Sequence, residues 1–287
     1  ESILVEISDA PAGFPSTTKA LINEGRPGGL SGLLNDTAAS VRREAANAIG
    51  DLLSGVPREM RPSERPTSGE IDAGRSVLES RLKIEKEPSV AAMILATLGR
   101  LKYTDDGTRD AVEASLVEHA TEPTSRIQGA AEGLEALIRG NPKRLVSGRT
   151  REAMRMWASA LRYNLRTRIV SLMALQQARD DDVETLVRAS NDSESQVRRL
   201  VALRLDAARD EFRQIIDLLS TDTDFTVRYE MANVFARHAA RTRECADLIR
   251  SFDDQEPTVV LRAIDLLPPA CGDNADAVTQ LARWAEE

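Results

Sequence analysis

A short helical motif recurs seven times along the chain. In each copy an apolar residue lies five positions after an acidic or amide side chain and four positions before a second apolar residue. The central residues are Val41, Val90, Ile127, Ile169, Val197, Val227 and Val259. The acidic or amide residues before them are Asp36, Glu85, Glu122, Asn164, Asp192, Asp222 and Asp254. Successive copies lie 49, 37, 42, 28, 30 and 32 residues apart. A helical unit repeated at such intervals predicts an α-solenoid.

Each copy is interpreted as two helices joined by a turn that holds the acidic residue. The clearest pair lies within 30–53, where Val41, Ala45 and Ile49 follow the period of a buried helical stripe. Eight positions after the central residue, the third and fourth copies carry Glu135 and Gln177 and break the apolar rule. Either these helices are rotated or the register differs there. We predict an all-α, right-handed superhelix of about seven to eight helical pairs.

The copies resemble the HEAT and HEAT-like (armadillo-like) repeat family, including its short PBS-lyase type, over residues 30–287. In that family an Asp of the turn and an Arg six positions later form a ladder between neighbouring repeats. The matching pairs here are Asp36 with Arg42, Asp192 with Arg198, and Asp222 with Arg228. The other four copies carry Ala91, Gln128, Val170 and Val260 in place of the Arg. The resemblance therefore implies a ladder that is interrupted in the middle of the chain.

Prolines and glycines divide the predicted solenoid from its irregular parts. Residues 1–29 precede the first pair and are expected to form an irregular N-terminal cap, which covers the exposed end of the stack. The solenoid is expected over 30–287. Segment 55–75 contains three prolines and is expected to be an inserted loop. That loop either covers the surface or binds a partner.

Composition limits the environment and the fold class. Aromatic residues make up 3% of the chain, fewer than a β-sandwich usually needs. No apolar run approaches the ~20 residues of a membrane span, so no membrane partner is expected. Only two cysteines occur, Cys245 and Cys271, which suggests a reducing compartment and a cytoplasmic location. Because they are 26 residues apart and close to one repeat junction, a disulfide between them stays open.

A strongly basic stretch lies in the middle of an acidic chain. Residues 139–168 carry a net charge of +8, whereas the whole chain carries −8. On a helix that begins near Thr150, Arg151, Arg155 and Arg162 fall within about 40° of one another and face solvent. This surface is either a solvated face neutralised by acids of neighbouring repeats or a docking surface for an acidic protein segment or a nucleic-acid backbone. The candidate partner-binding residues, which include two arginines outside the ladder, are Arg43, Arg144, Arg149, Arg151, Arg155, Arg162, Arg166 and Arg199.

Side chains suited to catalysis or metal binding are few. His119 and His238 lie in different repeats, and neither has a metal ligand at the usual spacing. The acids of 180–182 lack the order of a calcium-binding loop and are expected to form a solvated helix start. No phosphate-binding glycine loop is present. The sequence therefore predicts no catalytic residue, metal or cofactor.

These observations together predict a non-catalytic interaction or scaffolding module, and not an enzyme. It would bind a protein partner with an acidic segment through its second helices and the 139–168 stretch. A second hypothesis is nucleic-acid binding, as in HEAT-like DNA-repair proteins, which the acidic total charge disfavours. A third, a bilin lyase or chaperone, follows only from the resemblance to the short repeat type.

Overall fold

The regular secondary structure of the described residues is all helical. A computed structural model describes residues 29–54, 65–141 and 146–286, so the predicted cap before Gly29, and Arg144 of the basic stretch, lie outside the described residues. The described residues form fifteen α-helices and three short 3-10 helices, with no strand among them. The prediction of an all-α fold is confirmed. The single predicted solenoid divides into two compact units, Glu1–Ala153 and Met154–Glu287, with the boundary inside helix α9 (Gly148–Ser159).

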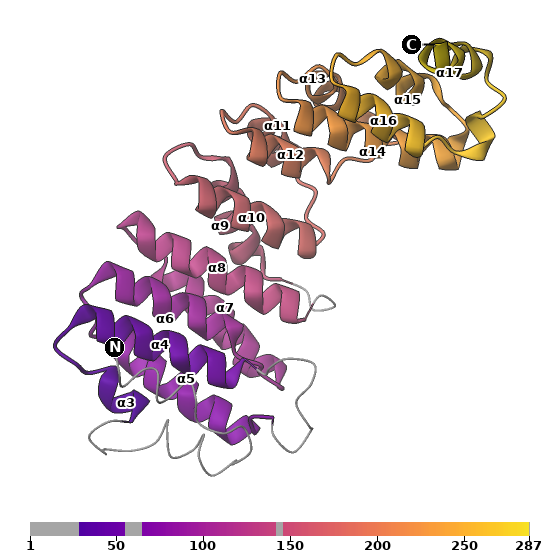
Figure 1. Cartoon of the computed structure of the whole chain (residues 1–287). Helices are drawn as coiled ribbons and strands as arrows, with labels where there is room; N and C mark the ends of the chain where they lie inside the picture. Colours follow the sequence, from indigo (N-terminus) through magenta and orange to yellow (C-terminus); the bar gives the residue numbers. More distant parts are fainter. Residues whose placement is uncertain (1–28, 55–64, 142–145, 287) are drawn as a thin grey trace. The chain divides into compact units, whose positions relative to one another are not determined.

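The first unit consists of helices stacked in two layers. Its helices are α3 (Leu30–Leu33), α4 (Ala39–Leu53), α5 (Ser68–Leu82), α6 (Pro88–Arg100), α7 (Asp106–His119) and α8 (Thr124–Gly140). The second helix of each pair, α4, α6 or α8, packs beside the next one, with α6 in the middle (Figure 1). Ile49, Ile94, Leu95 and Leu134 are fully buried where these helices meet. The core of this unit therefore follows the stripe of its second helices.

The predicted loop 55–75 is shorter than expected, because α5 begins at Ser68. Thr67 and Glu70 form a capping box: the hydroxyl of Thr67 accepts from the N–H of Glu70 at 3.3 Å, and the Glu70 carboxylate accepts from the N–H of Thr67 at 2.7 Å. The last proline of the segment, Pro66, precedes this cap. It therefore does not interrupt the helix. Residues 55–64 of the predicted loop lie outside the described residues.

Helices α6 and α8 approach each other more closely than a side chain at three positions would permit. A Cβ atom added to Gly99 would lie 1.9 Å from the backbone oxygen of Gly133, and one added to Gly129 would lie 2.2 Å from the oxygen of Ala92. A Cβ at Gly133 would lie 2.5 Å from another backbone oxygen of α6. Because backbone atoms cannot move aside like a flexible side chain, this contact requires glycine.

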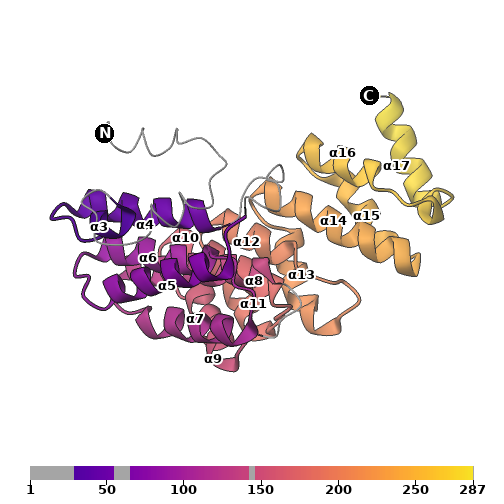
Figure 2. The ribbon, with the colours of Figure 1, turned by 90° about the horizontal axis from the view of Figure 1, so that it is seen from below.

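The second unit continues the same arrangement. Its helices are the end of α9, then α10 (Leu165–Gln177), α11 (Val183–Ser190), α12 (Ser195–Ala202), η2 (Asp210–Phe212), α13 (Arg213–Ser220), α14 (Phe225–Thr242), α15 (Ala246–Arg250), η3 (Ser251–Asp253), α16 (Pro257–Asp265), η4 (Pro269–Cys271) and α17 (Ala275–Glu286). Helices α10, α12, α14 and α16 form one layer in which each contacts the next, and α14 and α16 lie side by side in both views (Figures 1 and 2). The side chains of Asn164, Asp182 and Asp224 cap α10, α11 and α14. These short polar residues fix where each helix starts.

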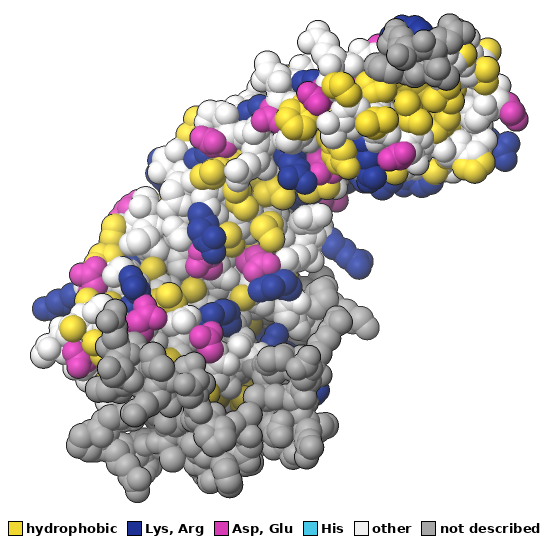
Figure 3. Space-filling model, viewed as in Figure 1, with side chains coloured by type: hydrophobic (Ala, Val, Ile, Leu, Met, Phe, Trp, Pro, Cys, Tyr) yellow, Lys and Arg dark blue, Asp and Glu magenta, His cyan; other side chains and the backbone are white. Residues whose placement is uncertain are grey.

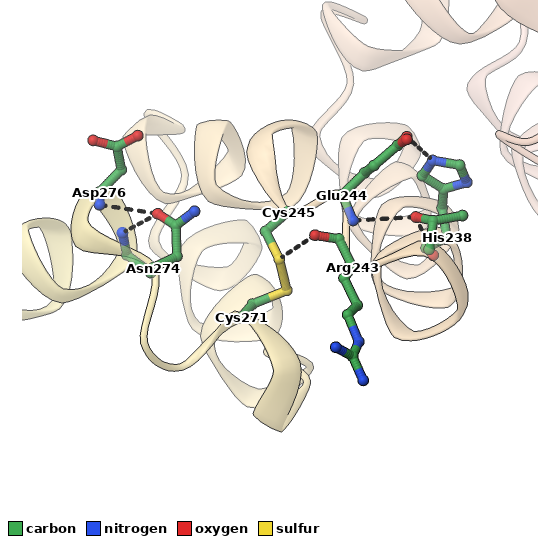
Figure 4. Close-up of a disulfide and its surroundings, with 9 residues drawn as sticks. His238, Arg243, Glu244, Cys245, Cys271, Asn274 and Asp276 are labelled. Carbon is green, nitrogen blue, oxygen red and sulfur yellow. Dashed lines mark hydrogen bonds and ion pairs between the residues drawn. A yellow bond between two sulfur atoms is a disulfide. The ribbon is translucent and has the colours of Figure 1, made fainter.

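A disulfide joins Cys245 and Cys271 in the second unit (Figure 4). Cys245 immediately precedes α15, and Cys271 ends η4, so the bond encloses the pair α15 and α16. The two cysteines are therefore paired, an alternative that the sequence left open. A reducing compartment would instead favour two free thiols.

Among the described residues, no helix is both long enough and apolar enough to cross a membrane.

Candidate functional site

Arginines at the fourth position after the helix N-cap link neighbouring helical pairs. The Nε and NH2 groups of Arg198 donate to the two carboxylate oxygens of Asp222 at 2.7 and 2.8 Å, and its NH1 donates to the carbonyl of Asp192 at 2.8 Å. Arg228 repeats this pattern with the carboxylate of Asp254 at 2.7 and 2.9 Å. Each guanidinium thus joins its own turn to the acid of the following turn, in the bidentate geometry that suits arginine.

Two more arginines have the same role. Arg42 donates to the Glu85 carboxylate at 2.9 and 3.0 Å and to the carbonyl of Asp36 at 2.9 Å. Arg168 donates to the Asp192 carboxylate at 3.1 Å and to a carbonyl of its own turn at 2.6 Å. In each case the carboxylate partner belongs to the next repeat. Within one repeat, Arg42 contacts Asp36, six positions earlier, only by donating to its backbone carbonyl and not to its carboxylate.

The ladder lowers the pKa values of its acids. Burial raises the pKa of the Glu85 carboxyl, but hydrogen bonds from Arg42, from a backbone N–H and from Arg81 outweigh burial and hold the pKa at about 2. The pKa values of Asp222 and Asp254 are also lowered, because the hydrogen bonds from their arginines outweigh the effect of burial. All three acids are therefore carboxylates at neutral pH.

The register of the third and fourth copies differs from the sequence alignment. In α10, the buried Leu175 fills the apolar place that the alignment assigned to Gln177, two positions later. With the same shift, Arg168 takes the ladder position, the fourth after the N-cap, to which the alignment had assigned Val170. In α8 the shift is one residue, so that the fully buried Leu134 replaces Glu135. The sequence missed Arg168 because its position is defined by the N-cap and not by the apolar spacing alone.

Two arginines of the basic stretch 139–168 pair with internal acids. Arg155 lies 2.8 Å from the Asp180 carboxylate and 3.4 Å from that of Asp182. Asp180 is buried, and Asp182 caps α11, so these acids are not the solvated group that the sequence predicted. Arg168 belongs to the ladder. These pairs favour the interpretation in which the basic stretch is neutralised within the fold.

The other arginines of the stretch lie in both units. In the first unit Arg149 is exposed, and Arg151 donates to a backbone carbonyl at 3.3 Å. In the second unit Arg162 donates to the hydroxyl of Tyr163 at 2.7 Å, and Arg166 is exposed on α10. Arg151 and Arg155 lie one turn apart on α9, but α9 ends at Ser159, so Arg162 lies beyond the helix on which the stripe was predicted.

The second helices of the second unit present four aligned rows of positions, here called the second-helix face. These are the second, fifth, sixth and ninth positions after each N-cap. They are Arg166, Ile169, Val170 and Met173 on α10; Gln196, Arg199, Leu200 and Leu203 on α12; Thr226, Tyr229, Glu230 and Asn233 on α14; and Thr258, Leu261, Arg262 and Asp265 on α16. All of them except Glu230 are at least partly exposed. Arg43, on α4 of the first unit, holds the position that corresponds to Arg199.

Large apolar side chains on this face are open to solvent. Met173 is 37% exposed, Leu203 36% and Leu261 62%. Apolar side chains gather over α16, with basic and acidic side chains around them (Figure 3). Exposed apolar side chains set among charges are typical of surfaces that bind another molecule.

A polar network fixes the centre of the second-helix face. Arg199 lies 2.8 Å from the carboxylate of Glu230, whose side chain is almost fully buried, while half of the Arg199 side chain is exposed. Asn233 donates to the other oxygen of Glu230 at 2.9 Å and accepts from Arg262 at 2.8 Å. The Arg262 guanidinium also lies 5.3 Å from the centre of the Tyr229 ring. The sequence singled out Arg199, but it gave no signal for Glu230 or Asn233, because three packed helices bring them together.

The histidines have local hydrogen-bond partners. His119 Nδ1 lies 2.9 Å from the carbonyl of Ser115, and His238 Nε2 lies 2.9 Å from the Glu244 carboxylate (Figure 4). Within the described part of the chain, no group of three or more His, Cys, Asp or Glu side chains is placed to hold a metal ion.

Comparison with known proteins gives likenesses of structure. No protein-family model matches the sequence, and neither does any curated protein. A structure of human deoxyhypusine hydroxylase in complex with glycerol is similar over 88% of this chain and 88% of its own, at 19% identity and a TM-score of 0.35. An engineered protein is similar over 88% of this chain and 95% of its own, at 18% identity and a TM-score of 0.33. A chain in a structure of Kap95p with RanGDP is similar over all of this chain and 33% of its own, at 13% identity and a TM-score of 0.39.

One of these structures corrects a prediction from the sequence. The chain was predicted to be a non-catalytic scaffold and not an enzyme, partly because of its helical-repeat fold. That prediction is wrong, because a similar fold belongs to an enzyme, the hydroxylase. Activity depends on sites placed on a fold and not on the fold itself, so helical repeats are no evidence against catalysis.

The likenesses, at these identities and TM-scores, concern the fold alone. The stacked helical pairs and the arginine–carboxylate ladder agree with them. The chain has a HEAT-like helical-repeat fold.

Proposed function

We propose that the second unit binds an acidic, partly apolar segment of a protein partner across its second-helix face. The observation that carries this proposal is the placement of Arg199. Its guanidinium is fixed by Glu230, half of its side chain is exposed, and it lies in the row that contains Ile169, Tyr229 and Leu261. A cation held rigidly among apolar side chains loses little conformational entropy when it binds an anion.

Charge complementarity supports an acidic segment. Among the described residues, the NH1 group of Arg199 makes no hydrogen bond, so it can donate to a carboxylate. Arg166 adds a second exposed cation on the neighbouring helix α10. Glu230, an acid of the same face, is buried and neutralised by Arg199, which leaves Asp265 as the exposed acid of the face. With Arg262, the face carries three arginines against these two acids, so it is basic although the chain is acidic overall.

Apolar contacts would supply the remaining affinity. Met173, Leu203 and Leu261 belong to three different helices, so one segment that crosses the helices can contact each of them. Binding to successive second helices is a mode that helical repeats allow, because each repeat presents the same positions. A surface of this kind can serve an enzyme that recruits a protein substrate as well as a binding protein.

Selection from a displayed library of random peptides tests the proposal. We expect the enriched peptides to combine Asp or Glu with apolar residues. Their binding should weaken at least about tenfold when Arg166→Glu and Arg199→Glu are combined, because two attractive charges become repulsive. Arg213→Glu is the matched control. Arg213 is exposed on α13, the first helix of its pair, and so lies outside the second-helix face.

Three outcomes would overturn the proposal. One is enrichment of basic or neutral peptides, or of none. Another is equal weakening by Arg213→Glu. A third is tighter binding of duplex DNA than of any selected peptide, with an affinity that falls steeply as salt rises, since counterion release marks phosphate contacts. That result would favour nucleic-acid binding instead.

A further inference from the structure

A pocket lies at the end of α12 and against the C-terminal half of α14, beside the second-helix face. Its volume is about 530 Å³. Its walls include Leu203, Arg204, Asp206, Val234, Arg237 and Arg241. Pockets of this size hold small organic molecules. The sequence gave no signal for it, because its residues come from the α12–η2 connection and from the far half of α14.

Positive charge dominates the lining of this pocket. Three arginines and one acid line it: Asp206 pairs with Arg241 at 2.6 Å, and Arg204 lies 3.3 Å from Asp181, which is outside the lining. Arg237 is exposed and donates to the carbonyl of Leu205 at 3.4 Å. No carboxylate of the described residues pairs with Arg237. The pocket therefore holds more cations than its own acids neutralise.

Arg204, which also lines the pocket, has a buried guanidinium. Its side chain is 2% exposed, and two of its guanidinium nitrogens, Nε and NH1, have no hydrogen-bond partner among the described residues. The NH2 group donates to the carbonyl of Asp180 and lies 3.3 Å from the carboxylate of Asp181. Arginine does not deprotonate in proteins, so this charge stays in place. A buried guanidinium with unpaired donors costs free energy, which an anion nearby reduces.

The remaining wall is apolar. Leu203, Leu205 and Val234 line the pocket with the arginines. Leu203 is 36% exposed, so part of its side chain can cover a ligand. Apolar walls with a few convergent charged groups are typical of sites that orient a small ligand by its charged end.

We propose that this pocket binds a small organic anion. Its carboxylate or phosphate group lies between Arg237 and Arg241, and its apolar body rests on Leu203 and Val234. Planar guanidinium groups suit both head groups, because each offers paired oxygens to the two-donor fork of arginine. This site is separate from the peptide surface of the second-helix face, although Leu203 borders both.

Calorimetry and thermal unfolding with four probes test this site on the whole chain. The probes are octanoate, octyl phosphate, inorganic phosphate and octanol. We expect octanoate and octyl phosphate to bind and to raise the melting temperature, inorganic phosphate to bind more weakly, and octanol to leave the protein unchanged. The stronger of octanoate and octyl phosphate identifies the preferred head group.

Substitutions locate the binding. Arg237→Gln should weaken octanoate binding at least about tenfold, because a charge-assisted contact is lost. Arg213→Gln, the matched control outside the pocket, should bind as the unmodified chain does. Arg237 is exposed, so this change leaves the core intact. Modification by phenylglyoxal gives a second readout: octanoate should protect Arg237 and Arg241 but not Arg213.

Several results would overturn the proposal. Equal binding of octanol and octanoate would reduce the pocket to an apolar surface. Absence of binding by both anionic probes, or equal affinity of Arg237→Gln and the unmodified chain, would remove the anion site. Peptide selection on the second-helix face is measured separately with Arg166→Glu and Arg199→Glu, so either proposal can fail alone.

Discussion

The α6–α8 contact of the first unit and the ladder of the second unit keep neighbouring helical pairs in place by different means. In the first unit, Arg42 and Glu85 join α4 to the turn before α6. Helices α6 and α8 meet instead through Gly99, Gly129 and Gly133, and α6 carries Ala91 at the ladder position. In the second unit, arginine–carboxylate pairs join α10 to α12, α12 to α14, and α14 to the turn before α16. The α6–α8 contact depends on close backbone packing, whereas the ladder depends on charge. A repeat that lacks the ladder arginine can thus be fixed by close backbone packing.

The largest expected effect is at the glycine contact. Gly99→Val should destabilise the chain by at least about 3 kcal/mol, because the new side chain meets backbone atoms of α8 that cannot move aside. Urea unfolding measures the change. Gly69→Ala is the matched control: no atom lies within 4 Å of its added Cβ, and the change should be neutral or slightly stabilising. If Gly99→Val were no more harmful than Gly69→Ala, the close contact would be refuted.

Removal of the disulfide should have the next largest effect. The bond closes a loop between residues 26 positions apart. Its loss should therefore destabilise the second unit by about 3 kcal/mol, through the greater freedom of the unfolded chain. Cys245→Ser combined with Cys271→Ser, compared with the unmodified chain by thermal unfolding, measures this effect. An unchanged unfolding temperature would mean that the cross-link does not contribute to stability.

The ladder should show a smaller effect that depends on both partners. Asp222→Asn should destabilise the chain by about 2 kcal/mol, because Arg198 is left partly buried without its carboxylate. The combination with Arg198→Gln should cost less than the sum of the two single changes. The exposed pair of Arg188 and Glu184 is the control, since Arg188→Gln should stay within about 0.5 kcal/mol. Strict additivity at Arg198 and Asp222 would contradict the ladder.

A pH series should separate the ladder from the glycine contact. The pKa of Glu85 is lowered from 4.5 to about 2, so its stabilising effect is complete above pH ~4.5 and is lost as the pH falls towards 2. The lowered pKa values of Asp222 and Asp254 act in the same direction. We expect the free energy of unfolding to decrease over this acid range and Glu85→Gln to reduce the slope. Gly99→Ala should keep the full slope, and a slope unaffected by Glu85→Gln would be inconsistent with the ladder.

The sequence predicted the helical pairs because apolar spacing and turn acids are local features. It failed where the structure depends on packing between segments. The apolar alignment placed Gln177 where Leu175 is buried and so missed Arg168, since the helix start is fixed by the Asn164 cap. Proximity of Cys245 and Cys271 depends on how α15 and α16 fold back, which spacing alone does not determine.

The candidate sites were predictable only in part. Arg43 and Arg199 could be singled out because they stand next to ladder arginines without belonging to the ladder. The role of Glu230 and the pocket beside Arg237 could not, because each combines side chains from different helical pairs. Total charge was also misleading at 139–168, since Arg155 and Arg168 are neutralised by acids distant in sequence.

Hydrogen exchange measured by mass spectrometry tests the difference between the glycine contact and the ladder most directly. Exchange rates of Asp222→Asn and Gly99→Ala are compared with those of the unmodified chain under native conditions. The account predicts faster exchange in α12 and α14 for Asp222→Asn, and in α6 and α8 for Gly99→Ala, with the other pair of helices unchanged in each case. Equal acceleration of both pairs by either variant would contradict the separation of a charge-based ladder from a packing-based contact.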